Sequence, residues 1–192
     1  MKTTNLPFEK TIEAYDFVFH PEMDKRMVMN LFDLSFLKQR ANVIFLGPPG
    51  VGKTHLATAL ALKACYSGVS IYFTTMADLI HKLKEDEASN RHGRPRSHYK
   101  SALVVVDEVG YMPLSRSEAH LFFQFVSYRY EKSSTLITSN KSFSEWGDLF
   151  GDSVIVTAIL DRLLHYCQVI NIKGKSYRMR RYEEKQADTL TG

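Results

Sequence analysis

The sequence predicts an α/β fold in which helices cover both faces of an open, mostly parallel sheet. Five short apolar runs alternate along the chain with segments of helical periodicity, as parallel sheets require. The first run leads directly into Gly47–Thr54 (GPPGVGKT), which matches the phosphate-binding pattern G-x-x-x-x-G-K-[ST]. Together these observations predict a P-loop NTPase core built as a three-layer sandwich.

The expected elements follow one another in a regular order. We expect strands at 43–46, 70–74, 102–107, 135–139 and 168–172. Helical periodicity indicates helices at 22–39, 53–66, 76–85, 115–130, 143–150 and 154–165. Residues 86–100 are polar and basic and contain Gly93 and Pro95, so we expect an exposed loop or a partly disordered segment there. The domains expected are an N-terminal arm (1–20), one core domain (21–178) and a basic C-terminal tail (179–192).

Length and composition favour a single globular domain. The chain has 192 residues, of which 44% are hydrophobic, enough for a sizeable core. No apolar run approaches the ~20 residues that span a membrane, and the first ten residues lack the apolar stretch of a secretory signal. Cys65 and Cys167 lie in apolar surroundings without metal-binding spacing, which is typical of a reducing compartment. We therefore expect a cytoplasmic protein.

The glycine-rich loop and the turn after it form the predicted nucleotide site. Glycines allow a tight turn whose N–H groups point at phosphate oxygens, and the following helix N-terminus adds partial positive charge. We expect ATP or ADP with Mg²⁺ here: Lys53 would reach the β- and γ-phosphates, and the Thr54 hydroxyl would ligate the metal. The expected contacts are Gly47, Pro48, Pro49, Gly50, Val51, Gly52, Lys53, Thr54 and His55. A glycine turn that binds nothing is the alternative, and the correct strand and helix flanks disfavour it.

Polar residues follow two of the later strands. Asp107 and Glu108 end the apolar strand at 102–107, where ligands bind in such sheets. We expect Asp107 to hold Mg²⁺ beside Thr54, and Glu108 to act as the base that polarises the attacking water. Asn140 ends the next strand and could position that water, although an asparagine is also ordinary in a turn.

Arg162 has two interpretations from the residues alone. It lies in a predicted helix among apolar neighbours (ILDRLLH). It could be an arginine finger that stabilises charge on the phosphoryl group bound by a neighbouring subunit. Alternatively, it forms an ordinary ion pair with Asp161 or Glu145.

The charge distribution permits nucleic-acid binding. The net charge is +4, the pI is about 9.0, and basic side chains cluster in the segment before the third strand. The expected DNA contacts are Lys82, Lys84, Arg91, Arg94, Arg96 and Lys100. Gly93 and Pro95 among these charges favour contacts to the DNA backbone over base recognition. The alternative is a charged, solvated loop.

With these motifs, the chain resembles the AAA+ ATPases and, more closely, the IstB-like proteins, the ATP-dependent helpers of insertion-sequence transposases. These are related to the DnaC helicase loaders and the DnaA initiators. The resemblance spans about residues 6–178. Its motifs are NVIFLGPPGVGKTHLA, YFTTMADLI, VVVDEVGYMPL, ITSN, AILDRLLHYC and INIKGKSYR. The run DE-x-GY-x-PL is specific to this group, whereas the phosphate loop is not.

The resemblance implies roles for individual residues. Gly47–Thr54 corresponds to Walker A, Asp107 and Glu108 to Walker B, Asn140 to sensor 1 and Arg162 to the arginine finger. It also implies the strand order 5-1-4-3-2, head-to-tail assembly, and a DNA path along the segment between the second and third strands. Two departures are expected. The helical segment that usually precedes the ATPase domain is short here, and a helical lid after the last strand is absent.

Three functions fit these features. The first is an ATPase that assembles on double-stranded DNA and assists a transposase. The second is a DnaC-like loader that binds single-stranded DNA and a replicative helicase. The third is a nucleotide-dependent binding module with negligible hydrolysis, and the base Glu108 argues against it.

Overall fold

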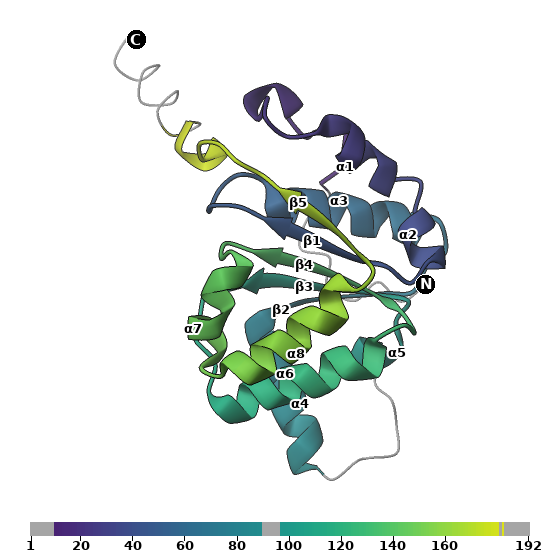
Figure 1. The fold of residues 1–192 in the computed structure, drawn as a ribbon. Coiled ribbons are helices and arrows are strands. Elements are labelled where there is room, and N and C mark those ends of the chain that lie inside the picture. The colour runs from purple at the N-terminus through teal and green to yellow at the C-terminus, as the bar shows by residue number, and fades with distance from the viewer. Residues whose placement is uncertain (1–9, 90–96, 181, 183–192) are drawn as a thin grey trace.

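The computed structural model describes residues 10–89, 97–180 and 182 of the chain. Its centre is a five-stranded sheet in which all the paired strands are parallel (Figure 1). The strands are β1 (Asn42–Leu46), β2 (Ile71–Thr75), β3 (Leu103–Val109), β4 (Ser134–Ser139) and β5 (Cys167–Asn171). Their order, β2-β3-β4-β1-β5, confirms the predicted order 5-1-4-3-2.

Helices cover both faces of the sheet and complete the three layers (Figure 1). One face packs against α1 (Lys25–Leu31), α2 (Ser35–Lys38) and α3 (Lys53–Tyr66). The other packs against α4 (Met76–Ala88), α6 (Arg116–Arg129), α7 (Trp146–Phe150) and α8 (Ser153–Leu164). Shorter elements are η1 (Phe17–Phe19), α5 (Ser97–Lys100) and η2 (Phe143–Glu145). No helix among the described residues is long and apolar enough to cross a membrane.

The strands are apolar on both faces because each face has its own core. Successive side chains of a strand point to opposite sides of the sheet. Val43 and Phe45 of β1 therefore pack with α3, whereas Ile44 and Leu46 pack in the second core. This double burial explains why the strands read as continuous apolar runs.

Local capping signals set the helix ends that the sequence indicates. The Thr75 hydroxyl accepts a 3.1 Å hydrogen bond from the amide of Asp78 and caps α4. Gly68 follows α3 with φ of 81°, and its amide donates to the Cys65 carbonyl at 2.9 Å. The cap at Thr75 matters for the site because Met76, the first residue of α4, lines a pocket together with Glu108.

The single helix expected over 22–39 is wrong. Two helices, α1 and α2, occupy this stretch, and Leu34 between them has φ of 61°. The Asp33 carboxylate accepts a 2.7 Å hydrogen bond from the amide of Ser35 across this break. The apolar spacing continues on both sides of the break, so periodicity alone could not reveal it.

The exposed loop expected over 86–100 is also wrong at both ends. Helix α4 continues to Ala88, and α5 occupies Ser97–Lys100. His98 is buried, with Nε2 placed 3.0 Å from Oδ2 of Asp86. Residues 90–96 lie outside the described part of the chain.

A buried arginine joins α5, α6 and β4 at the amino end of the sheet. Arg129 is 1% exposed and donates from Nη1 to the carbonyls of Tyr99 at 3.1 Å and Ser101 at 3.0 Å. Its Nε also donates to the hydroxyl of Thr135 at 3.1 Å. Burial lowers the pKa of this guanidinium to about 10. The hydrogen bonds hold the start of β3 against α6.

Candidate nucleotide-binding site

The phosphate loop follows β1 at the carboxyl end of the sheet and leads into α3. Lys53 opens α3 and folds back over the loop, where Nζ donates to the carbonyls of Gly47 at 2.7 Å and Pro48 at 2.8 Å. Burial lowers the pKa of the Lys53 amine, and the nearby Asp107 carboxylate opposes this shift. The lysine is thus held at the loop by groups that phosphate oxygens could replace.

Thr54 and Asp107 meet directly, although 52 positions separate them in the sequence. The Thr54 hydroxyl donates to Oδ1 of Asp107 at 3.1 Å. Asp107 is buried at the end of β3, and its Oδ1 also accepts from the hydroxyl of Thr138 on β4. The two residues predicted to hold Mg²⁺ therefore lie side by side, and each carries an oxygen that suits this ion.

Glu108 lies in a backbone irregularity of β3. The pairing of β3 with β4 shifts between Val106 and Val109, and Glu108 has φ of 64°. Its amide donates to the Thr138 hydroxyl at 3.1 Å, and its side chain is exposed. Positive φ is uncommon for a residue with a side chain and often marks a functional position. This turn exposes the Glu108 carboxylate, while Asp107 before it stays buried.

Asn140 follows β4 and lies against the same bulge. Its Oδ1 is buried and has no hydrogen-bond partner among the described residues. A Cβ placed on Gly110, which has φ of 111°, would come within 2.5 Å of this oxygen. The structure therefore brings the Asn140 amide close to the segment that carries Glu108, and only glycine at position 110 allows this approach.

The segments before α1 and after β5 both contact the phosphate loop, and the sequence predicts neither of the specific contacts. The Tyr15 hydroxyl donates to the Val51 carbonyl at 3.0 Å, and burial raises the pKa of this tyrosine. The amide of Tyr177 donates to the Gly50 carbonyl at 3.0 Å. A Cβ on Gly50 would lie 2.0 Å from Oγ of Ser176, so the C-terminal segment is packed directly on the loop.

These two segments also contact each other (Figure 1). The rings of Phe19 and Tyr177 meet edge to face with centroids 5.4 Å apart. Nη1 of Arg180 lies 3.6 Å from Oδ2 of Asp16, and its guanidinium stacks on Phe19 at 5.1 Å. Clustered aromatic residues near position 17 were the only sequence signal for this arrangement.

The family model for IstB-like ATP binding proteins matches residues 1–185. Two relatives have similar sequences. The insertion sequence IS21 ATP-binding protein of Pseudomonas aeruginosa is 47% identical over 192 residues, covering 100% of this chain and 72% of that protein. The IS5376 ATP-binding protein of Geobacillus stearothermophilus is 44% identical over 192 residues, covering 98% of this chain and 76% of that protein. This chain belongs to the IstB-like family.

Solved structures share the fold of this IstB-like chain. The DnaC helicase loader superposes with a TM-score of 0.67 and 26% identity, covering 86% of this chain and 98% of that one. The replication initiator DnaA bound to AMPPCP and single-stranded DNA gives a TM-score of 0.70 at 17% identity, covering 95% of this chain and 56% of that one. Together with the strand order, these likenesses show an AAA+ P-loop core.

Arg162 lies far from the phosphate loop of its own IstB-like chain. It is in the last turns of α8, where Nδ2 of Asn42, at the start of β1, donates to the Leu163 carbonyl at 2.9 Å. The phosphate loop follows the opposite end of β1. The Arg162 guanidinium donates to the Ala158 carbonyl at 2.9 Å and stacks on Phe123 at 4.8 Å. Glu145, one of the alternative partners, instead pairs with Lys141 at 3.0 Å.

The basic residues expected to contact DNA are only partly described. Lys82 and Lys84 lie on α4, and Lys84 pairs with Glu118 at 2.6 Å. Lys100 is exposed at the end of α5. The remaining candidates, Arg91, Arg94 and Arg96, lie outside the described residues.

Proposed function

We propose that this IstB-like chain is a Mg²⁺-dependent ATPase that assembles on double-stranded DNA and assists a transposase in DNA transposition. The observation that carries the enzymatic part is the contact between Thr54 and Asp107 beside the phosphate loop, with Glu108 and Asn140 at the same edge of the sheet. Family membership supports the link to transposition.

Phosphate binding would use groups that are already positioned. Lys53 exchanges the carbonyls of Gly47 and Pro48 for β- and γ-phosphate oxygens. The residues of the loop other than Pro48 and Pro49 supply backbone N–H groups at the N-terminus of α3. Mg²⁺ held by Thr54 and Asp107 would neutralise charge on the phosphates during transfer.

Hydrolysis would use the two polar residues beside the metal ligands. Glu108 accepts a proton from the attacking water, and its exposed carboxylate leaves room for that water. Asn140 orients the water through its amide, which would satisfy the buried Oδ1 or its neighbouring nitrogen. Glu108 lies near the end of β3 and Asn140 directly after β4, so the packed sheet positions both residues.

Arg162 would act on the nucleotide of a neighbouring subunit. Its position at the amino end of β1 prevents it from reaching its own phosphate loop. A head-to-tail contact joins two different surfaces, and repetition of that contact gives a ring or an open helix. An arginine supplied in this way stabilises charge on the transferred phosphoryl group.

DNA binding would use the basic residues of α4, α5 and the segment between them. The proposed contacts are Lys82, Lys84, Arg91, Arg94, Arg96 and Lys100. Each phosphate that they neutralise adds about 0.7 to 0.9 to the slope of affinity against salt. Double-stranded DNA is the favoured substrate because the relatives belong to insertion sequences.

A helicase loader is the second candidate function. The 26% identity with the DnaC helicase loader, over nearly all of that chain, favours it. Such a protein would bind single-stranded DNA and a replicative helicase.

Light scattering of the purified protein tests these functions together. Samples contain ATP or ADP, with double-stranded, single-stranded or no DNA, and Lys53→Ala is the control. Large particles that need both ATP and duplex DNA are the expected result. Assembly on single strands alone would favour the helicase loader, and a monomer in every sample would overturn the proposed assembly.

A further inference from the structure

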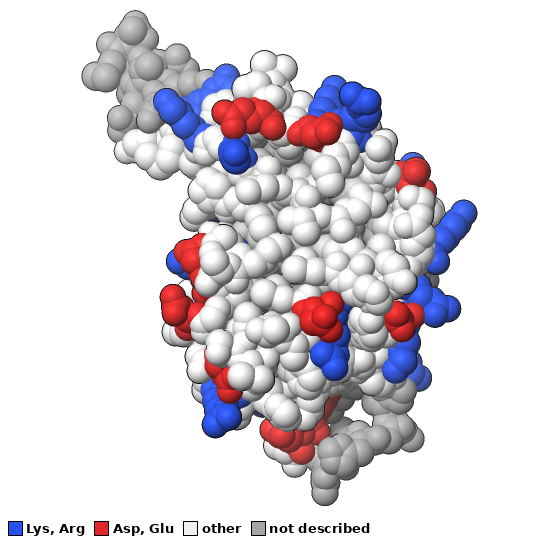
Figure 2. All heavy atoms as spheres, in the orientation of Figure 1, with Lys and Arg blue, Asp and Glu red and all other residues white. Residues whose placement is uncertain are grey.

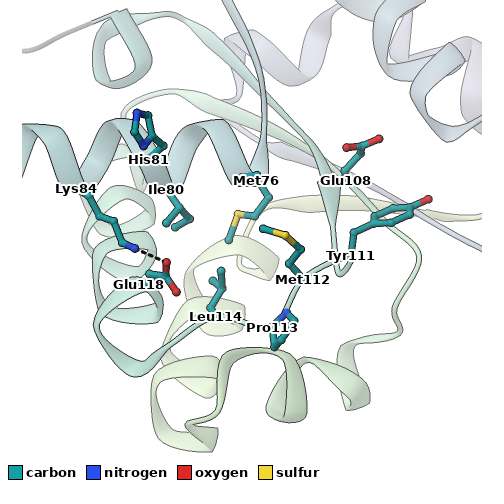
Figure 3. Close-up of a pocket in the computed structure, with 11 residues that line it drawn as sticks. Met76, Ile80, His81, Lys84, Glu108, Tyr111, Met112, Pro113, Leu114 and Glu118 are labelled. Atoms are coloured by element: carbon teal, nitrogen blue, oxygen red, sulfur yellow. Dashed lines mark hydrogen bonds and ion pairs between the residues drawn. The ribbon is translucent and has the colours of Figure 1, made fainter.

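An apolar groove lies beside Glu108, between α4 and the segment that joins β3 to α6 (Figure 3). Its volume is about 300 Å³. The side chains at its centre are apolar and come from both walls: Met76, Ile80, Met112 and Leu114. The ion pair of Lys84 with Glu118 lies at one end, and Glu108 and Tyr111 lie at the other (Figure 3).

The groove has features of a contact surface. Met112 and Tyr111 are 57% and 53% exposed, which is unusual for large apolar side chains that adjoin a cavity. Methionine side chains adapt readily to the shape of a partner. The Glu108 carboxylate makes no hydrogen bond or ion pair with the rest of the described chain, so this end of the groove carries an uncompensated negative charge.

The opposite end of the molecule carries the complementary features. Arg162 contacts a carbonyl and a ring but pairs with no carboxylate among the described residues. Close to it, Leu164 and Tyr166 are 37% and 54% exposed. Figure 2 shows that the face carrying α8 and β5 has few charged side chains over its centre. Arg162 thus lies near exposed apolar side chains, with the exposed Asp161 and Glu131 also close to it. Arg162, Leu164 and Tyr166 are called the Arg162 surface below.

We propose that this groove receives Leu164 and Tyr166 of a second copy of the chain. This inference rests on the proposed head-to-tail assembly and names the surface that would form it. The apolar side chains fill the groove, and Arg162 of the second copy approaches the end where Glu108 lies. The pairing matches apolar surface with apolar surface, and the Arg162 guanidinium with the Glu108 carboxylate.

One molecule cannot make this contact with itself. Glu108 lies near the carboxyl end of β3, whereas Arg162 precedes β5 and lies at the amino end of β1. The groove and the Arg162 surface therefore belong to opposite ends of the sheet. Each contact leaves one groove and one Arg162 surface open, so further copies can be added.

A mixing experiment with two variants tests the groove. Met112→Asp disrupts the groove, and Tyr166→Asp disrupts the surface beside Arg162. Each change places a charge in the proposed apolar contact, so we expect at least ~10-fold weaker association in sedimentation with ATP and duplex DNA. Val18→Asp is the control, because Val18 is 88% exposed on η1, away from both surfaces. Circular dichroism confirms folding, and Met112→Ala serves as a milder second variant.

A mixture of the Met112→Asp and Tyr166→Asp variants gives the decisive result. The Tyr166→Asp variant keeps an intact groove, and the Met112→Asp variant keeps an intact Arg162 surface. The mixture can therefore form one unaltered contact, between the groove of the first variant and the Arg162 surface of the second. We expect pairs to form and ATP turnover to recover in part, whereas a chain carrying both changes recovers nothing. Normal association of Met112→Asp, or no recovery in the mixture, would overturn the assignment of the groove.

The control proteins separate this inference from the proposed function. In one outcome, wild type assembles, Arg162→Ala slows ATP turnover and Met112→Asp assembles normally. That outcome would contradict the role of the groove but leave the proposed assembly standing. If wild type stays monomeric with ATP and DNA, the proposed assembly and the groove both fail.

Discussion

The hydroxyl of Thr138 donates a hydrogen bond to Oδ1 of Asp107. The same hydroxyl oxygen accepts a hydrogen bond from the amide of Glu108 at 3.1 Å. One buried side chain on β4 therefore supports both acidic residues at the end of β3. This relationship explains how Asp107 stays buried while Glu108, one residue later, turns outward.

Replacement of Thr138 should affect both stability and turnover. We expect Thr138→Val to lower the free energy of unfolding by ~1–3 kcal/mol, because it leaves buried polar groups without a partner. ATP turnover should also fall, since the turn at Glu108 loses its acceptor. Denaturant unfolding and phosphate release measure these effects. Thr138→Ser keeps the hydroxyl, and equal unfolding of the two variants would contradict the supporting role.

Removal of the Lys53 amine should abolish tight ATP binding. We expect Lys53→Ala to weaken ATP affinity by ~100-fold or more, because a charge-assisted contact to phosphate is lost. Isothermal titration calorimetry measures the affinity. Lys63→Ala is a matched control, since Lys63 lies exposed in the last turn of the same helix. Unchanged affinity of Lys53→Ala would refute the phosphate-loop assignment.

The Glu108 carboxylate should be needed for hydrolysis but not for binding. We expect Glu108→Gln to slow ATP turnover by ~10²- to 10⁴-fold, the range for loss of a general base. ATP affinity should stay close to that of wild type, and assemblies on DNA should persist in light scattering. Glu87→Gln is the control for the loss of a charge, because Glu87 is an exposed residue of α4. Normal turnover would exclude Glu108 as the base.

Packing of the C-terminal segment on the phosphate loop can be tested at Gly50. Gly50 and Gly68 have φ of 83° and 81°, but a Cβ would clash with Ser176 only at Gly50. We expect Gly50→Ala to cost ~1–3 kcal/mol of unfolding free energy beyond the cost of Gly68→Ala, since overpacking adds to the shared backbone strain. Thermal and denaturant unfolding compare the two.

A compensating change makes the Gly50 test specific. Ser176→Gly in the Gly50→Ala background removes the clashing hydroxyl and should restore part of the lost stability. Equal costs of the two alanine variants, with no restoration, would mean that the segment does not press on the loop.

Much of the fold was predictable because its signals are local. The five strands are continuous apolar runs, and Thr75 and Gly68 mark helix ends through short-range hydrogen bonds. The phosphate loop and the two acids near the end of β3 were likewise recognisable, because their chemistry requires fixed residue types at fixed spacing. Their meeting at Thr54 and Asp107 follows from parallel strands that end at one edge of the sheet.

The remaining features depend on contacts between distant residues or on backbone angles. Nothing in the sequence near Leu34 distinguishes a residue with positive φ from the middle of a helix. Thr138 is one of several small polar residues in β4, and its role appears only when β3 lies beside it. The contacts of Tyr15 and Tyr177 with the loop join residues far apart in the sequence, which periodicity does not report.

The contact of Tyr177 with Gly50 also orders events during synthesis. The phosphate loop leaves the ribosome early, whereas Ser176 and Tyr177 follow the last strand of the sheet. The residues of the loop are therefore made long before the segment that covers them exists. A nascent chain stopped after β5 would present the Gly50 carbonyl uncovered. The nucleotide site therefore reaches its final shape only after the segment that follows β5 has been made.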